Sequence, residues 1–165
     1  MEFIIRPIHI GDGKEINKLR RMPGVFENIL GIPSERIQQN EDFIIHMDGN
    51  SHQFVAVSRD RQGEEKIIGT AGLIIFSNPR LRHSASMGIM VDKEYQNKGV
   101  GTALIKTILD IADNWLMLVR VELGVLVDNT NAIHLYEKFG FKKEGTKKMA
   151  VIRNGEYIDE LIMAR

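Results

Sequence analysis

A glycine-containing junction between Met87 and Ala103 constrains the fold more than any other segment of the chain. Its sequence, Met-Gly-Ile-Met-Val-Asp-Lys-Glu-Tyr-Gln-Asn-Lys-Gly-Val-Gly-Thr-Ala, indicates an apolar strand, a turn, a Gly-x-Gly loop and the start of a long helix. The first N–H groups of a helix have no partner within it, and the helix dipole favours negative charge there. The junction therefore predicts a site for a phosphate or a pyrophosphate.

Two common phosphate-binding loops do not fit the spacing of this junction. No segment has the Gly-x-x-x-x-Gly-Lys-Ser/Thr pattern of a P-loop. A dinucleotide-binding fingerprint requires a third glycine where this chain has Leu104, and it follows the first strand of a βαβ unit, whereas this loop follows the fourth predicted strand. The remaining interpretation is the pyrophosphate of coenzyme A.

Composition excludes several other classes of site. The chain has 165 residues, enough for one domain with a core, and its 22 basic and 22 acidic residues cancel, so nothing suggests nucleic acid or an anionic membrane as a partner. No apolar stretch approaches the roughly 20 residues of a membrane span. The absence of cysteine excludes thiol nucleophiles, and the five histidines show no paired ligand spacing, so we expect no metal and a cytoplasmic protein.

Hydrophobic periodicity predicts one α/β (α+β) domain over residues 1–165, with a mixed sheet and helices on its faces. The expected strands are 3–6, 53–59, 66–76, 84–91, 120–127, 141–153 and 156–164, with turns at 60–63 and 154–155. The expected helices are 12–22, 34–47, 99–117 and 131–139. The apolar stripe of the third helix is Val100, Leu104, Ile108, Ile111, Trp115 and Leu118.

Two motifs resemble those of the GNAT superfamily of N-acetyltransferases. Residues 96–103, Gln-Asn-Lys-Gly-Val-Gly-Thr-Ala, resemble its Gln/Arg-x-x-Gly-x-Gly/Ala signature, and residues 129–141 resemble its Asn-x-x-Ala-x-x-Leu-Tyr-x-x-x-Gly-Phe motif. The order of elements also matches that family, and the C-terminal half looks like the branch of small bacterial amino-acid and phosphinothricin-type enzymes. The resemblance implies a mostly antiparallel sheet of six or seven strands, in which the parallel strands ending at Val91 and Val127 splay apart.

The resemblance implies acetyl-CoA as the co-substrate. The pantetheine arm would pair with the backbone near Ile89 and Val91, and the pyrophosphate would lie on the N–H groups of residues 98–102. Lys98 is equally open to a phosphate contact and to a solvated charge, and Asn129 is both a helix N-cap and a contact for the cofactor amides. The expected cofactor-binding residues are Ile89, Val91, Gln96, Asn97, Lys98, Gly99, Val100, Gly101, Thr102 and Asn129.

Tyr136 and Glu122 are the expected catalytic residues. The family assigns the tyrosine at the position of Tyr136 as the general acid for the leaving thiolate, and a phenol with a pKa of about 10 suits a thiolate of about 8.5. The apolar helix face that carries Tyr136 would by itself favour a role as an aromatic residue of the core. Glu122 alternates against an apolar strand face, so it is open to a role as general base or as the structural partner of an arginine. Many family members carry an acidic residue in the strand ahead of the pyrophosphate loop, but residues 86–90 of this chain include none.

The function that these inferences predict is an acetyl-CoA-dependent N-acetyltransferase for the primary amine of a small molecule, such as an amino acid. Without cysteine, we expect direct attack in a ternary complex. The family's acceptor pocket would include the segment from Arg20 to Ile32, with Met22, Val25, Phe26 and Leu30. The alternatives are a ribosomal-protein or peptide N-terminal acetylase and a non-catalytic acyl-CoA-binding module. Family habit implies a homodimer.

Overall fold

A computed structural model describes residues 2–59 and 62–165 and contains one seven-stranded sheet. The strand order is β1-β2-β3-β4-β5-β7-β6, and every neighbouring pair is antiparallel except β4 and β5. The strands are β1 Ile4–Pro7, β2 Ser51–Arg59, β3 Glu65–Ile75, β4 Ser84–Val91, β5 Arg120–Leu126, β6 Lys142–Arg153 and β7 Glu156–Ala164. The α-helices are α1 Gly13–Arg20, α2 Ile37–Ile45, α3 Val100–Asp110 and α4 Thr130–Lys138.

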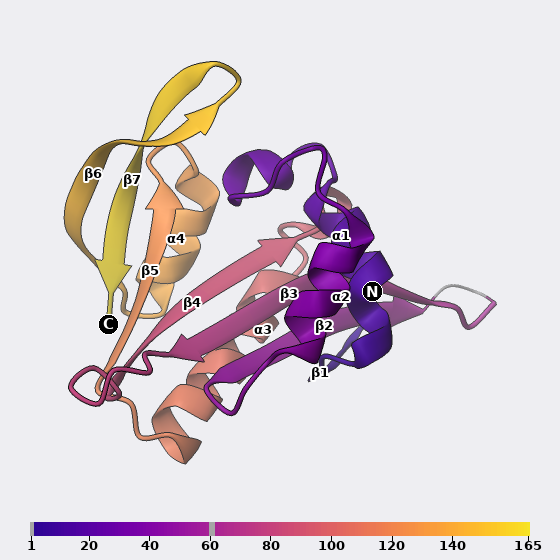
Figure 1. The fold of residues 1–165 in the computed structure, drawn as a ribbon, viewed down its shortest axis with the longest axis horizontal. Helices are drawn as coiled ribbons and strands as arrows, with labels where there is room; N and C mark the ends of the chain where they lie inside the picture. The colour runs from indigo at the N-terminus through magenta and orange to yellow at the C-terminus, as the bar shows by residue number, and fades with distance from the viewer. Residues whose placement is uncertain (1, 60–61) are drawn as a thin grey trace.

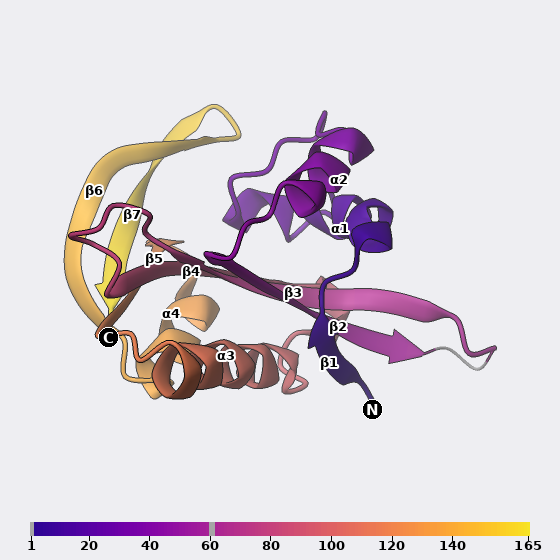
Figure 2. The ribbon, with the colours of Figure 1, turned by 60° about the horizontal axis from the view of Figure 1, so that its bottom comes forward.

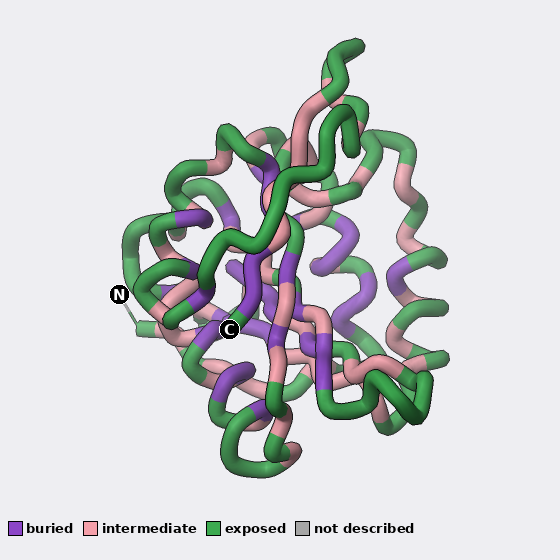
Figure 3. Tube along the Cα trace, turned by 90° about the vertical axis from the view of Figure 1, so that its left-hand side faces the viewer, coloured by how far each residue is buried: buried purple, intermediate pink, exposed green. Residues whose placement is uncertain are grey.

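Helices cover both faces of the sheet. The helices α1 and α2 lie on one face, and α3 and α4 lie on the other (Figures 1 and 2). The larger apolar core joins α3 and α4 to the sheet, and a smaller core joins α1 to β2 and β3. The β6–β7 hairpin curves toward the side of α1 and α2, and β6 is largely exposed, whereas buried positions gather in the interior (Figure 3).

The parallel strands β4 and β5 part soon after they meet. They pair only from Ser84 opposite Arg120 to Ser86 opposite Glu122, and β5 then continues beside β7 (Figure 1). The N–H of Asp92 donates to Ile68 on β3 at 2.9 Å, so the even positions of β4 face β3. Because successive residues of a strand alternate, the backbone groups at Ile89 and Val91 face the opening between β4 and β5. We call this opening the split.

The predicted fold class is confirmed, including the splayed parallel pair, and most element bounds agree within three residues. The third helix is the main exception, because a π-helical segment at Ile111–Trp115 follows α3. The wider turn shifts the helix phase, so Trp115 is 74% exposed, while Leu118 still packs against the core. The prediction that Trp115 belongs to the apolar stripe was wrong.

The turn predicted at 60–63 includes Asp60 and Arg61, which lie outside the described residues. Within the part of the chain that the structure describes, no helix is long and apolar enough to cross a membrane.

A buried ion pair fixes the point where β4 passes into the glycine loop. Asp92 is fully buried, and its Oδ1 accepts the N–H of Glu94 at 2.9 Å. Its Oδ2 lies 2.8 Å from the ammonium of Lys66 on β3, and this contact raises the pKa of Lys66. The carboxylate therefore ties the start of the loop to the neighbouring strand through a charge that only Lys66 balances among the described residues.

We expect Lys66→Met to lower the free energy of unfolding by about 1–3 kcal/mol, because it leaves a buried carboxylate without its counter-charge. The low end of that range allows for water, since the Lys66 side chain is 35% exposed. Urea unfolding measures the change, and Lys106→Met on the exposed face of α3 is the matched control. Adding Asp92→Asn to Lys66→Met should restore part of the loss. An equal cost of Asp92→Asn in both backgrounds would contradict the pairing.

Candidate active site

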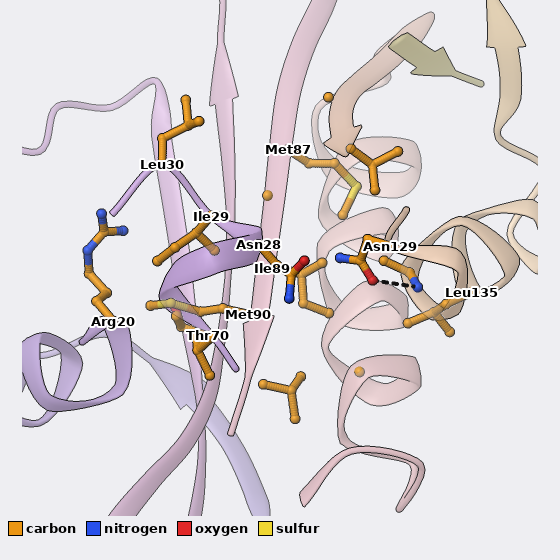
Figure 4. A pocket seen from close by; sticks show the side chains of 18 of the residues that line it. Arg20, Asn28, Ile29, Leu30, Thr70, Met87, Ile89, Met90, Asn129 and Leu135 are labelled. Carbon is orange, nitrogen blue, oxygen red and sulfur yellow. Dashed lines mark hydrogen bonds between the residues drawn. The ribbon is translucent and has the colours of Figure 1, made fainter. Parts of the chain in front are cut away.

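One large cleft runs through the split and over the face of the sheet that carries α1 and α2. Its volume is about 1330 Å³. Alternating positions of β3 and β4 form its floor, which is open at Gly88, whereas the Gln53 side chain fills the space over the facing Gly72. The residues of this floor are Thr70, Gly72, Ile74, Ser86, Gly88 and Met90. Figure 4 shows the cleft between the α1 side, with Arg20 and Asn28, and the α4 side, with Asn129 and Leu135.

The N-terminus of α3 opens into this cleft. Gly99 precedes the helix with φ +86°, a left-handed conformation that glycine adopts without strain. The first hydrogen bond of the helix runs from the N–H of Ala103 to the carbonyl of Gly99 at 3.0 Å, so the N–H groups of residues 100–102 have no partner inside the helix. Gly101 and Thr102 line the cleft, and a side chain at Gly101 would press on Leu135. This geometry suits an anion.

Only some residues of the glycine loop, 96–102, have side chains that line the cleft. Gln96 and Asn97 line the cleft, but the Gln96 side chain donates to the carbonyl of Val91 at 3.1 Å. The Lys98 ammonium lies 5.5 Å from the centre of the Tyr95 ring, over a separate surface hollow. Val100 is fully buried in the core. Lys98 and Val100 are not among the residues that line the cleft, so only their backbone N–H groups are left for the expected phosphate contact.

Asn129 has the N-capping role expected of it. Its side-chain oxygen accepts the N–H of Ala132 at 3.3 Å, at the start of α4, and the residue also lines the cleft (Figure 4). Its own N–H donates to the carbonyl of Leu126 at 3.0 Å, which holds the turn after β5. The cap thus fixes α4 against the end of the strand that borders the split.

Tyr136 belongs to both the core and the cleft. It is 5% exposed, its ring centre lies 5.8 Å from that of Phe141, and it lines the cleft from the α4 side. Burial raises the pKa of the Tyr136 phenol above its usual value. The hydroxyl therefore stays protonated through neutral and moderately basic pH, so it can donate a proton or a hydrogen bond to a group in the split.

Glu122 does not join the cleft. Its carboxylate accepts a hydrogen bond from Nε of Arg120 at 2.9 Å, and the same guanidinium reaches Glu144 on β6. Glu122 is also absent from the residues that line the cleft. Of the two interpretations left open by the sequence, the structure shows the arginine partner, because a guanidinium two residues away on the same strand binds the carboxylate.

The α1 side of the cleft carries polar groups that sequence reasoning missed. Arg20 and Glu35 form a two-bond ion pair, at 2.5 and 3.0 Å, and Asn40 donates to Glu35 at 2.8 Å. Burial alone would raise the pKa of Glu35, but the hydrogen bonds from Arg20 and Asn40 hold it below its usual value. Arg20 ends α1, Asn40 lies in α2, and a long loop separates Arg20 from Glu35, so no local spacing could have joined them.

The predicted acceptor segment contributes only in part. Val25 and Leu30 line the cleft, whereas Met22 packs in the smaller core, and Phe26 is not among the lining residues. Glu160 on β7 also lines the cleft and was not predicted, because its place there depends on the pairing of β7 with β5, a strand distant in sequence.

Comparisons with known proteins agree with this geometry. The model of the acetyltransferase (GNAT) family matches residues 22–141. The L-amino acid N-acetyltransferase AaaT of Escherichia coli (strain K12) is 34% identical over 99% of this chain and 98% of its own length.

Two solved structures share the fold. The spermidine N-acetyltransferase of Vibrio cholerae in complex with CoA and spermine has a TM-score of 0.82 and 30% identity, and the match covers 99% of this chain and 94% of that one. A putative phosphinothricin N-acetyltransferase has a TM-score of 0.83 at 19% identity, over 99% and 98% of the two chains, and this match shows the fold alone.

Gly99 should resist substitution for a conformational reason alone. A Cβ at this position would meet no atom within 4 Å, so Gly99→Ala tests the backbone and not the space. We expect a loss of about 1–2 kcal/mol in the free energy of unfolding, the cost of holding an alanine in the left-handed region. Urea unfolding of Gly11→Ala, another open position but without positive φ, is the control. Equal changes in the two variants would refute the conformational cost.

Proposed function

The chain belongs to the acetyltransferase (GNAT) family, and we propose that it transfers the acetyl group of acetyl-CoA to the primary amine of a small molecule. One observation carries the proposal: the split between β4 and β5 opens onto the unpartnered N–H groups at the start of α3. The family membership makes the chain an N-acetyltransferase. The binding mode, the mechanism and the acceptor are the proposed parts.

The split would hold the pantetheine arm of the coenzyme, and the α3 N-terminus would hold its pyrophosphate. The pyrophosphate lies against the N–H groups of residues 98–102, where the helix dipole and the donors both favour negative charge. The pantetheine arm enters the split and pairs with the backbone at Ile89 and Val91, as an added strand would. The carbonyl of Val91 already accepts from Gln96, so its N–H is the group left for the arm.

The proposed reaction is direct attack of the amine on the thioester. The nitrogen lone pair attacks the carbonyl carbon, the C–S bond breaks, and the electron pair leaves with sulfur. The acceptor ammonium loses two protons overall. One is matched by the proton that the thiolate gains, and the other is released to solvent. Tyr136 would donate the proton to sulfur, and the buried site that raises its pKa also disfavours a free thiolate.

An amino acid is the acceptor class that we propose. The relative AaaT, which covers 99% of this chain, is named for that activity. The cleft combines apolar side chains at Val25, Ile29 and Leu30 with the paired charges of Arg20 and Glu35, which suits a small zwitterion with an apolar side chain. The peptide-terminal and non-catalytic alternatives are not carried forward, because the named relatives are small-molecule N-acetyltransferases.

The decisive experiment follows CoA release with a panel of L-amino acids, spermidine and short peptides as acceptors. The proposal expects turnover with free amino acids and intersecting lines in a double-reciprocal plot of initial rates. Parallel lines would count against the ternary complex. Thermal stabilisation by CoA without release in the presence of any amine would refute acetyl transfer.

Tyr136→Phe should lower kcat by roughly 10²–10³, the scale of general acid catalysis, and leave the affinity for CoA unchanged. The ring contact with Phe141 is kept, so the fold should survive. The exposed Tyr157 supplies the control Tyr157→Phe. Since the raised pKa keeps the phenol protonated, the kcat of the unaltered protein should show no decline from Tyr136 ionisation up to a pH of about 10. An unchanged kcat in Tyr136→Phe would remove the acid role.

A further inference from the structure

A carboxylate on β7, that of Glu160, lies in the cleft at the place of a missing side chain. A Cβ built on Gly124 of β5 would come within 2.7 Å of the Glu160 carboxyl carbon. The two strands pair here, with Leu126 opposite Glu160 and Gly124 opposite Ile162. Both Gly124 and Glu160 line the cleft. The carboxylate can therefore lie across β5 only because residue 124 has no side chain.

Glu160 is the cleft carboxylate whose charge is least balanced among the described residues. Glu35 is bound by the Arg20 guanidinium and by Asn40. The carboxylate of Glu160 has one ion-pair partner, Lys147, at 3.5 Å, and the Lys147 side chain is 63% exposed. The Glu160 side chain is itself only 19% exposed. It is thus a shielded negative charge with lone pairs still open to the cleft.

Glu160 lies on β7 opposite Leu126 of β5, and the direction of the β5 backbone shows that this charge lies at the split. The N–H of Val127 donates to Asp159, and the N–H of Val121 donates to Arg165, so odd positions of β5 face β7. The backbone of Gly124 therefore faces the opposite side, toward the split. Glu160 lies on the sheet face of α1 and α2, whereas Tyr136 reaches the cleft from the side of α4. The two side chains flank the opening from opposite faces.

We propose that Glu160 binds the ammonium group of the acceptor and thereby selects cationic primary amines. That the bound amine is the acetyl acceptor rests on the proposed function. A partly buried carboxylate attracts an ammonium more strongly than an exposed one, because little water screens the pair. Bound there, the amine lies at the mouth of the split, next to the position of the thioester. Glu160 is thus a specificity-determining residue, and Gly124 provides the space that it needs.

The first test is calorimetric titration of the CoA-saturated protein with L-leucinamide, which carries an ammonium and an apolar side chain but no carboxylate. Glu160→Gln keeps the shape of the side chain and removes its charge. We expect it to bind L-leucinamide about 10- to 100-fold more weakly, the usual loss for a hydrogen bond to a charged group. Glu156→Gln, at an exposed position of the same strand, is the matched control and should bind as the unaltered protein does.

Two further variants change the same interaction without removing Glu160. Lys147→Met removes the competing cation, so it should tighten binding of L-leucinamide by about two- to fivefold, the scale of a surface ion pair. Gly124→Ala should displace the carboxylate and weaken binding as Glu160→Gln does, with no added loss in the double variant. Weaker binding in Lys147→Met, or a Glu160→Gln variant within twofold of the unaltered protein, would overturn the inference.

Steady-state kinetics separate this inference from the proposed function. With an amine that is turned over, Glu160→Gln should raise the KM for the amine and leave the KM for acetyl-CoA unchanged, with a small effect on kcat. If L-leucinamide binds in a Glu160-dependent way but no amine releases CoA, the acetyl-transfer proposal fails and the ammonium site stands. If amines are acetylated with the same KM in Glu160→Gln, or if the unaltered protein binds no L-leucinamide, the ammonium site fails.

Discussion

The parting of β4 and β5 is the constraint on which the rest of the structure depends. Two parallel strands that stay paired would use up the backbone groups at Ile89 and Val91, and no molecule could enter between them. The pairing with β4 ends at Ser86 and Glu122, whereas the other edge of β5 stays paired with β7, whose far edge carries β6. The C-terminal hairpin therefore holds β5 along one edge while the other edge lies open to the split.

The split also divides the chemistry between two faces of one sheet. The α4 face supplies Tyr136, a phenol held in its neutral form by burial, and the α1 face supplies charged groups. Glycines make this division possible, because Gly88 leaves the floor hollow and Gly124 admits the carboxylate of Glu160. Side chains at these positions would fill the space that a substrate needs. In the proposed reaction, Tyr136 as the acid and Glu160 as the binding charge would act on one bound molecule from two sides without neutralising one another.

The sequence predicts those features that arise from local patterns. The strand Ser84–Val91 follows from an apolar run, and the start of α3 after Gly99 follows from a glycine. Both are found where expected. The phase of the helix beyond Asp110 does not follow, because the π-helical turn that exposes Trp115 depends on packing. Side-chain directions are equally non-local: Lys98 lies over Tyr95, Glu122 binds Arg120, and Glu160 reaches the cleft only through the pairing of β5 with β7.

The amides along the inner edge of β4 have a consequence for how the molecule can be observed. In the free protein the N–H groups of Ile89 and Val91 face an opening with no neighbouring strand to receive them. Their hydrogens should therefore exchange with deuterium far faster than those of Gly88 and Met90, which face β3 in the same strand. An alternating pattern of fast and slow exchange within four consecutive residues would mark the split, and its disappearance would report the occupant directly, independent of any chemistry.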